Sequence, residues 1–262
     1  MRINLLNTPI DALSMAETVD LIDRAIARRE QLHHVVVNAA KLVYLQKDRD
    51  LYESVVACDL INADGQSVVW ASRFLGQPLP ERVAGIDLMQ ELVALAHRRG
   101  YRIFLFGATE EVVCKVADRY AREYSPDLVA GWRNGYFRPD EEEEIARQVA
   151  GSGADLLFVA ISSPKKEIFL NCYKELIRIP FVMGVGGSFD VVAGRTRRAP
   201  LWMQRCGLEW LFRLVQEPGR MWKRYLFTNL LFVYYVLREK LTGGKQAADI
   251  PHKGDPSPPS RY

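Results

Sequence analysis

Six short apolar runs, rich in β-branched and aromatic residues, alternate with longer segments of helical periodicity. This alternation constrains the fold more than any other feature of the chain. Strands are expected at residues 34–37, 59–62, 101–106, 128–130, 155–160 and 181–184, and amphipathic helices at 14–29, 87–99, 110–123, 140–150 and 164–177. Because strands separated by such helices form right-handed βαβ units, the pattern predicts one α/β domain with a mostly parallel sheet over residues 1–195. Ligands of such sheets bind at the carboxyl ends of the strands.

The sequence changes character in its last part, where residues 196–242 are helical in pattern, basic and rich in aromatic residues, with a break near Pro218. Between Arg195 and Lys240, ten Lys and Arg residues stand against three Glu residues, a net charge of about +7 in a chain whose total is +3. The pattern fits an interfacial helix, with cations for anionic head groups and aromatic rings for the boundary, although a helix packed in the core can look the same. Residues 243–262, rich in Pro, Gly and Ser, are predicted to be disordered.

Several classes of protein are not expected. The four cysteines form no CxxC pair and the four histidines show no metal-binding spacing, so the sequence predicts reduced intracellular thiols and no metal site. The amino terminus lacks the apolar core of a signal peptide, and no apolar run reaches the roughly 18 residues that a membrane span needs. No nucleic-acid-reading module is recognisable in the basic segment. A cytoplasmic protein without a nucleic-acid partner is therefore expected.

The stretch NADG, residues 62–65, places Asp64 directly after an expected strand. An Asp-Gly pair is typical of a turn, and Asp64 could equally cap a helix that begins near Gln66. A carboxylate at the carboxyl end of a strand can instead accept a proton from a substrate hydroxyl. The local sequence leaves the three interpretations open.

Two glycine-containing turns are candidates for ligand contact. In FLFGATEEV, Gly107 and Thr109 lie between a strand and a helix, as in phosphate-binding turns, but the two glutamates that follow would repel a phosphate. A nucleoside contact or a structural turn is therefore favoured there. In GVGGSFD, Gly186 and Gly187 allow close approach of a ligand to the backbone, and Asp190 is either a helix-turn carboxylate or a binding residue. The dinucleotide-binding GxGxxG pattern is incomplete.

The stretch ISSPKKE, residues 161–167, follows a buried strand and contains Ser163. Its Pro164 suits the first turn of a helix, so Lys165 and Lys166 place two cations where the helix dipole disfavours them. They are either solvated or held by a bound anion, such as a sugar nucleotide.

Six stretches carry a family signal when they are taken together. They are NADG, PLPERVAGIDLM, FGATEE, NGYF, ISSPKKE and the long block GVGGSFDVVAGRTRRAPLWMQRCGLEWLFRLVQEPGRMWKRYL. Over residues 3–240 the chain thereby resembles the WecG/TagA/CpsF family of bacterial glycosyltransferases. The resemblance implies a Rossmann-like α/β fold with helices on both faces, and a basic helical appendage at residues 196–242 that meets the membrane and helps to complete the active site.

The resemblance also implies an activity and a set of site residues. The activity is inverting, metal-independent transfer of N-acetylmannosamine or a related hexose from its UDP donor to an undecaprenyl-diphosphate-linked sugar, without a cofactor. Asp64 matches the catalytic base. The donor pocket is assigned to Asn38, Arg82, Gly107, Thr109, Ser163, Lys166, Gly186, Gly187 and Asp190. Cations expected near the acceptor diphosphate and the membrane are Arg198, Arg213, Arg220, Lys223 and Arg224.

The implied setting is the assembly of teichoic acid, common antigen, capsule or exopolysaccharide. The implied partners are the UDP-sugar, the lipid-linked acceptor and the inner face of the cell membrane, where the protein is attached peripherally; a homo-oligomer is left open. Two positions depart from the family pattern: Lys166 stands where Gln is usual, and Val36 where Thr is usual. The alternative is therefore a non-catalytic nucleotide-sugar-binding or membrane-scaffold protein of the same pathway.

Overall fold

The computed structural model describes residues 1–243, without the side chains of Arg205, Arg220, Met221 and Arg224. Its centre is a parallel six-stranded sheet in the order β4-β3-β8-β7-β5-β6. The strands are β3 (Leu32–Val37), β4 (Leu60–Ala63), β5 (Ile103–Gly107), β6 (Val129–Arg133), β7 (Leu156–Ala160) and β8 (Phe181–Gly184). All six expected strands are therefore confirmed, and so is the α/β fold class. The tail at 244–262, where disorder was predicted, lies outside the described residues.

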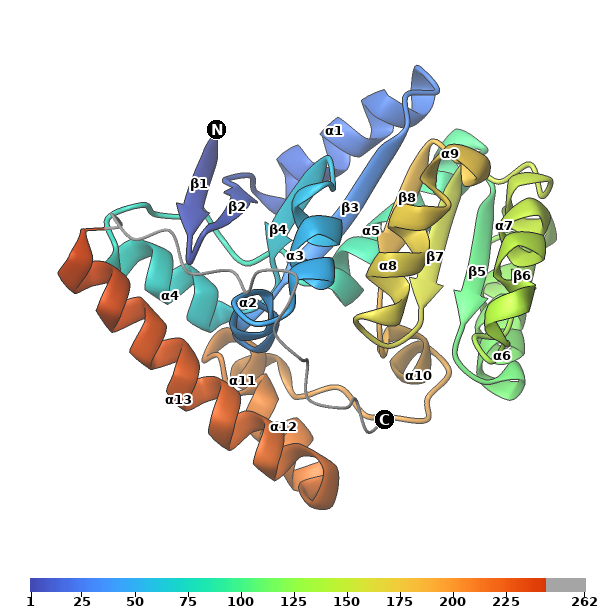
Figure 1. Cartoon of the computed structure of the whole chain (residues 1–262). Coiled ribbons are helices and arrows are strands. Elements are labelled where there is room, and N and C mark those ends of the chain that lie inside the picture. Colours follow the sequence, from blue (N-terminus) through green and yellow to red (C-terminus); the bar gives the residue numbers. More distant parts are fainter. Residues whose placement is uncertain (244–262) are drawn as a thin grey trace.

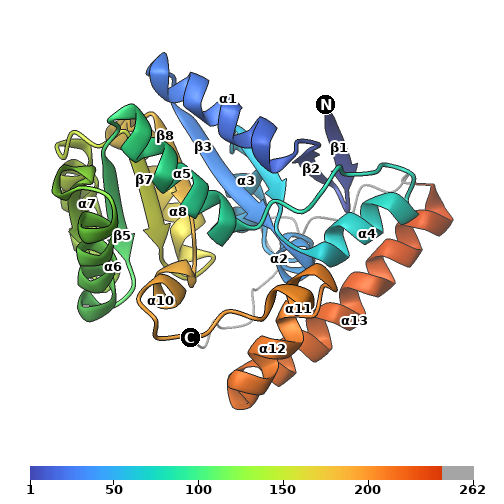
Figure 2. The same cartoon turned by 180° about the vertical axis from the view of Figure 1, so that it is seen from behind.

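Helices cover both faces of the sheet (Figures 1 and 2). One face carries α1 (Met15–Ala27), α5 (Gly85–Arg99), α6 (Glu110–Glu123) and α10 (Ser188–Val192), whose apolar residues form one core cluster with the strands. The other face carries α2 (Ala39–Leu45), α3 (Arg49–Val56), α7 (Glu142–Ala150), α8 (Lys165–Cys172) and α9 (Lys174–Ile177). The buried strands between them read as continuous apolar runs, as expected for a sheet covered on both sides.

Helix boundaries follow local chemistry. The Ser14 side chain accepts a hydrogen bond from the backbone N–H of Glu17, and Glu17 bonds back to Ser14, which fixes the start of α1. A left-handed Gly100 ends α5. The single helix expected over 164–177 is wrong: the chain leaves helical geometry at Tyr173, between α8 and α9. The break lets the short α9 turn Ile177 into the core beside α7 before the chain enters β8.

The pattern analysis missed an amino-terminal hairpin of β1 (Arg2–Leu5) and β2 (Thr8–Asp11). Its strands have four residues each, too few for a periodicity to be recognised, and its turn uses positive φ angles at Leu6 and Asn7. The hairpin packs beside β4, where Asp11 accepts a hydrogen bond from the backbone N–H of Ile61. Helix α4 (Gln66–Phe74) begins where the sequence predicts, and 3-10 turns lie at Pro126–Leu128 and Pro139–Glu141.

Three helices follow the sheet: α11 (Leu201–Arg205), α12 (Glu209–Gln216) and α13 (Pro218–Thr242). Helix α13 lies along α2, and its Phe232 and Val236 are buried in the same core cluster as the amino-terminal hairpin. Its opposite side is exposed and apolar. Within residues 1–243 no helix is both long and apolar enough to cross a bilayer. Helix α13 thus combines a core-packing side with an unpartnered apolar side.

Candidate active site

The site begins at the carboxyl ends of β3 and β4. The helices that follow these neighbouring strands lie on opposite faces of the sheet, α2 and α3 on one and α5 on the other, which opens a crevice where ligands of such folds bind. Asp64 follows β4 directly, and its backbone N–H donates to the carbonyl of Val37 at the end of β3. The expected position at a carboxyl strand end is therefore confirmed.

The Asp64 carboxylate does not cap α4, whose N-cap is Gly65 with no side-chain hydrogen bond. One carboxylate oxygen instead accepts from the backbone N–H of Gly85, the first residue of α5, at 3.1 Å. Burial raises the pKa of Asp64 to about 6, helped by the negative charge of Glu209 and opposed by Arg213. A carboxylate with a pKa near the working pH is well suited to act as a general base.

A group of charged side chains from three segments lies around Asp64. Arg82, in the loop before α5, pairs with Glu209 of α12 at 3.1 Å. Arg198, which precedes α11, holds Asp87 of α5 through two hydrogen bonds of 2.5 and 2.7 Å. Both arginines are largely buried, and Arg198 is electrostatically coupled to Asp64. The appendage therefore contributes side chains to the site itself.

Residues next to Asp64 have mixed roles. The Asn38 side chain accepts from the backbone N–H of Lys41 and so caps α2, while a side chain on Gly65 would contact it. Val36 packs against Gly85. Asn38 is thus fixed at the crevice by its capping bond, and its predicted contact with a donor stays a prediction.

The second expected group lies at the ends of β5 and β7. Gly107 has a φ of 128°, and a Cβ there would lie 2.5 Å from the carbonyl carbon of Ala160, so this position requires glycine. Thr109 caps α6, and Glu110 accepts a hydrogen bond from Asn134. These bonds account for a structural turn, and Ser163 remains exposed just before α8.

Lys166 is not solvated, nor is Lys165. The Lys166 side chain is 7% exposed, crosses Gly184 and pairs with Glu167 at 2.8 Å, while Lys41 of α2 pairs with the same carboxylate oxygen at 2.7 Å. Lys165 lies over the ring of Phe137, 3.6 Å from its centroid. Burial, together with the charge of Lys41, lowers the pKa of Lys166 to about 8.

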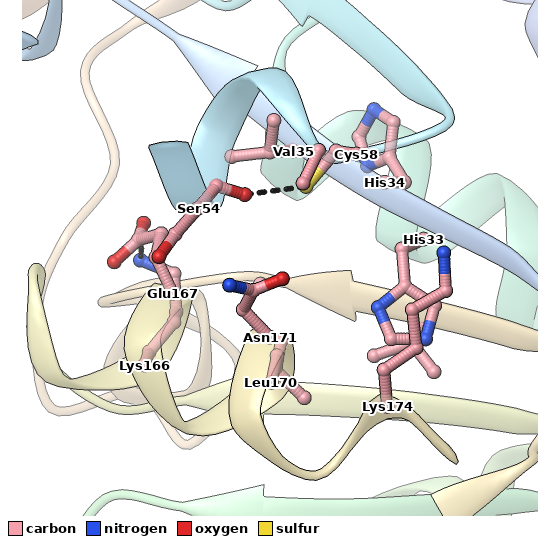
Figure 3. A pocket seen from close by; sticks show the side chains of 13 residues that line it. His33, His34, Val35, Ser54, Cys58, Lys166, Glu167, Leu170, Asn171 and Lys174 are labelled. Carbon is pink, nitrogen blue, oxygen red and sulfur yellow. Dashed lines mark hydrogen bonds and ion pairs between the residues drawn. The ribbon is translucent and has the colours of Figure 1, made fainter. Parts of the chain in front are cut away.

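This buried cluster of Lys41, Lys166 and Glu167 closes one end of a cavity of about 400 Å³ between α3 and α8. Figure 3 shows Lys166 and Glu167 at that end and His33 with Lys174 at the other. Burial, with a contribution from Lys174, lowers the pKa of His33 to about 4, so this imidazole is neutral at physiological pH.

The remaining predicted residues lie on α10 and on the appendage. A Cβ at Gly186 or Gly187 would meet nothing within 4 Å, which leaves the backbone there open to a ligand. Asp190 lies 3.9 Å from Arg195. In the appendage, Arg213 lies 3.6 Å from Glu209 and is half-exposed, whereas Lys223 lies over the Trp222 ring. The side chains of Arg220 and Arg224 lie outside the described part of the structure.

Four residues of these networks were missed from the sequence: Lys41, Asp87, Glu167 and Glu209. Asp87, Glu167 and Glu209 lie inside the quoted motifs PLPERVAGIDLM, ISSPKKE and GLEW, so the motifs contain the signal, but no local pattern pairs them with partners far along the chain.

A doubly covered parallel sheet with a desolvated carboxylate and several arginines at one crevice defines an enzyme that combines acid–base chemistry with an anionic substrate. The chain belongs to the glycosyl transferase WecG/TagA/CpsF family, whose model matches residues 3–246. It is therefore a glycosyltransferase, as the resemblance in the sequence predicted.

Two curated relatives carry the same name, N-acetylglucosaminyldiphosphoundecaprenol N-acetyl-beta-D-mannosaminyltransferase. The protein of Bacillus subtilis (strain 168) is 39% identical over 180 residues, 69% of each chain. The protein of Bacillus spizizenii (strain ATCC 23059 / NRRL B-14472 / W23) is 38% identical over 176 residues, 67% of each chain.

Proposed function

We propose that this glycosyltransferase moves a hexose, N-acetylmannosamine or a close relative, from a UDP-sugar to a sugar linked to undecaprenyl diphosphate. The names of the two Bacillus relatives support the acceptor and the transferred sugar. The structural observation that carries the proposal is Asp64, a carboxylate with a pKa of about 6 at the crevice between β3 and β4, surrounded by arginines from the appendage and the loop before α5.

The proposed reaction is a single inverting displacement. Asp64 takes the proton of the acceptor hydroxyl, and the acceptor oxygen forms a bond to the anomeric carbon from the face opposite the UDP. The bond from that carbon to the UDP oxygen breaks, and its electron pair leaves with the β-phosphate. Arg82 and Arg213, together with backbone amides near Gly186 and Gly187, offset the charge on the departing diphosphate. No metal ion or cofactor is assigned a step.

The identity of the donor is tested by a transfer assay with a panel of UDP-sugars. The purified protein is incubated with polyprenyl-diphosphate-GlcNAc and with its glucose analogue, and products are read by mass spectrometry. UDP-N-acetylmannosamine is expected to give the highest kcat/KM. If no UDP-sugar is transferred to either acceptor while UDP still binds, the proposal fails in favour of a nucleotide-sugar-binding or scaffold protein.

We also propose that the protein attaches peripherally to the inner face of the cell membrane through the exposed apolar side of α13. That side, at Trp222, Leu226, Phe227, Leu230, Val233, Tyr234, Leu237 and Leu241, runs along the helix. Lysine and arginine residues of the same helix can meet anionic head groups, a combination typical of interfacial helices. The acceptor's lipid would then be held at the surface where Asp64 works, in the assembly of a cell-surface polysaccharide.

Replacing Leu226 and Leu230 together by Glu is expected to abolish binding to vesicles of phosphatidylglycerol and phosphatidylethanolamine. Both side chains are more than half exposed, so the fold loses little. Each lost leucine costs about tenfold in membrane affinity by the area it would bury. Co-sedimentation measures the effect. Tyr136→Glu, which is also exposed but lies beyond β6, is the matched control and should sediment like the wild type. Unchanged sedimentation of the double variant would rule out this side of α13.

A further inference from the structure

The carboxylate of Glu209 joins two arginines that come from different parts of the chain. One of its oxygens lies 3.1 Å from Arg82, before α5, and the other lies 3.6 Å from Arg213, one turn further along α12. The Glu209 side chain is one-fifth exposed, so it sits at the mouth of the crevice rather than in the core. It therefore holds a planar, negatively charged group between two guanidinium groups at the entrance to Asp64.

These contacts differ from the neighbouring ion pair. Arg198 grips Asp87 with two short parallel hydrogen bonds, the strong bidentate form of this interaction. Glu209 instead makes one hydrogen bond to Arg82 and a longer ion pair to the half-exposed Arg213. The Glu209 contacts are thus the weaker ones, and their release frees two guanidinium groups without breaking the Arg198–Asp87 pair.

The charge of Glu209 also acts on Asp64. The charged groups that face Asp64 are Glu209 and Arg213 from α12, Arg82 from the loop before α5 and Arg198 from the segment before α11, and the backbone N–H of Gly85 completes the set. Among them Glu209 is the group that raises the pKa of Asp64, next to burial. A carboxylate that disfavours ionisation of the base is unexpected in this position unless it has another task.

We propose that Glu209 is a positioning residue that occupies the place of a substrate diphosphate, keeping Arg82 and Arg213 aligned until the diphosphate displaces it. A diphosphate offers the same kind of oxygens to the same two guanidinium groups, with more charge. Both the UDP donor and the lipid-linked acceptor of the proposed reaction carry such a group. The inference rests on the proposed function for the identity of the ligand, but not for the existence of the anion site.

The first test measures binding of inorganic pyrophosphate by calorimetry, which needs no turnover and stays interpretable if no sugar is transferred. Glu209→Gln removes the charge and keeps the shape of the side chain. It is expected to bind pyrophosphate on the order of fivefold more tightly than the wild type, because the competing carboxylate is gone. Glu53→Gln, which removes an exposed charge on α3, is the matched control and should leave binding unchanged. Weaker or unchanged binding in Glu209→Gln overturns the proposal.

The second test uses the transfer reaction. The KM that falls in Glu209→Gln, for the UDP-sugar or for the lipid-linked acceptor, identifies which diphosphate uses the site. The acidic limb of kcat/KM should move to lower pH, so that the rate at pH 5, relative to the plateau, rises roughly threefold. A loss of helix packing alone would not shift this limb. A limb that stays at the wild-type pH overturns the placement of Glu209 beside Asp64, and two unchanged KM values overturn the displacement.

Discussion

Asp64→Asn is expected to lower kcat for sugar transfer by about 10²- to 10⁴-fold, the usual contribution of a general base. The amide cannot accept the proton of the acceptor hydroxyl, but its oxygen can still accept the hydrogen bond from Gly85. Since the pKa of Asp64 is raised by burial, the neutral side chain fits its surroundings at no added electrostatic cost. UDP binding and the melting temperature should therefore stay close to those of the wild type.

The pH dependence follows from the same group. A base must be deprotonated to work, and burial with Glu209 raises the pKa of Asp64 to about 6. The wild-type rate should thus be constant above pH 7 and fall about tenfold per pH unit well below pH 6. Asp20→Asn, an exposed change on α1, is the control and should retain both rate and profile. Wild-type turnover in Asp64→Asn would exclude Asp64 as the base.

Glu167→Gln is expected to destabilise the fold by about 3–5 kcal/mol, the cost of leaving buried charges without a partner. Its carboxylate is 3% exposed and neutralises Lys41 and Lys166, which are 10% and 7% exposed. Burial alone would raise the pKa of Glu167, yet the two ammonium groups hold it at about 2. Its contribution to stability is present above pH 4.5 and is lost as the pH falls through that range toward 2.

The matched change on the partner side has a different outcome. Lys166→Gln leaves Glu167 paired with Lys41 and removes a cation whose pKa burial already lowers to about 8. The free energy of unfolding should change by no more than about 1 kcal/mol. Urea unfolding at pH 7 measures both variants. Equal losses for Glu167→Gln and Lys166→Gln would show that the cluster acts as a single pair rather than as two cations that share one carboxylate.

The same pair of variants bears on the departure at position 166. Because Lys166 already has Glu167 as a partner, it is not the solvated cation that its helix position suggested. We infer that any effect of Lys166 on donor choice acts through the cluster that joins the amino ends of α2 and α8. Lys166→Gln should then change the KM for the UDP-sugar together with the thermal stability, and the donor panel reads this directly.

The strands and the place of Asp64 could be predicted because they depend on local pattern. Buried strands of four to six apolar residues are legible in a single sequence, and a carboxylate directly after one of them must lie at the carboxyl edge of a parallel sheet. The hairpin β1–β2 was not legible, since its strands are too short to show a period.

The partners of the site residues could not be predicted for a different reason. Glu209 lies 127 residues from Arg82, and Lys41 lies 126 residues from Glu167. Their pairing depends on how the sheet is ordered and on where α12 returns to the crevice, and no local periodicity encodes either. The family motifs narrowed the choice to a few charged residues, and the fold decided which of them meet.

The carboxyl end of α13 has a consequence for how the chain is made. Phe232 and Val236 share a core cluster with Ile3 and Leu5, and Glu239 accepts a hydrogen bond from the backbone N–H of Leu6. On a ribosome the hairpin emerges first and the helix that covers it emerges last, so Ile3 and Leu5 stay without this cover until synthesis is nearly complete. A chain stopped at residue 195 would therefore leave an apolar surface bare rather than release a finished catalytic domain.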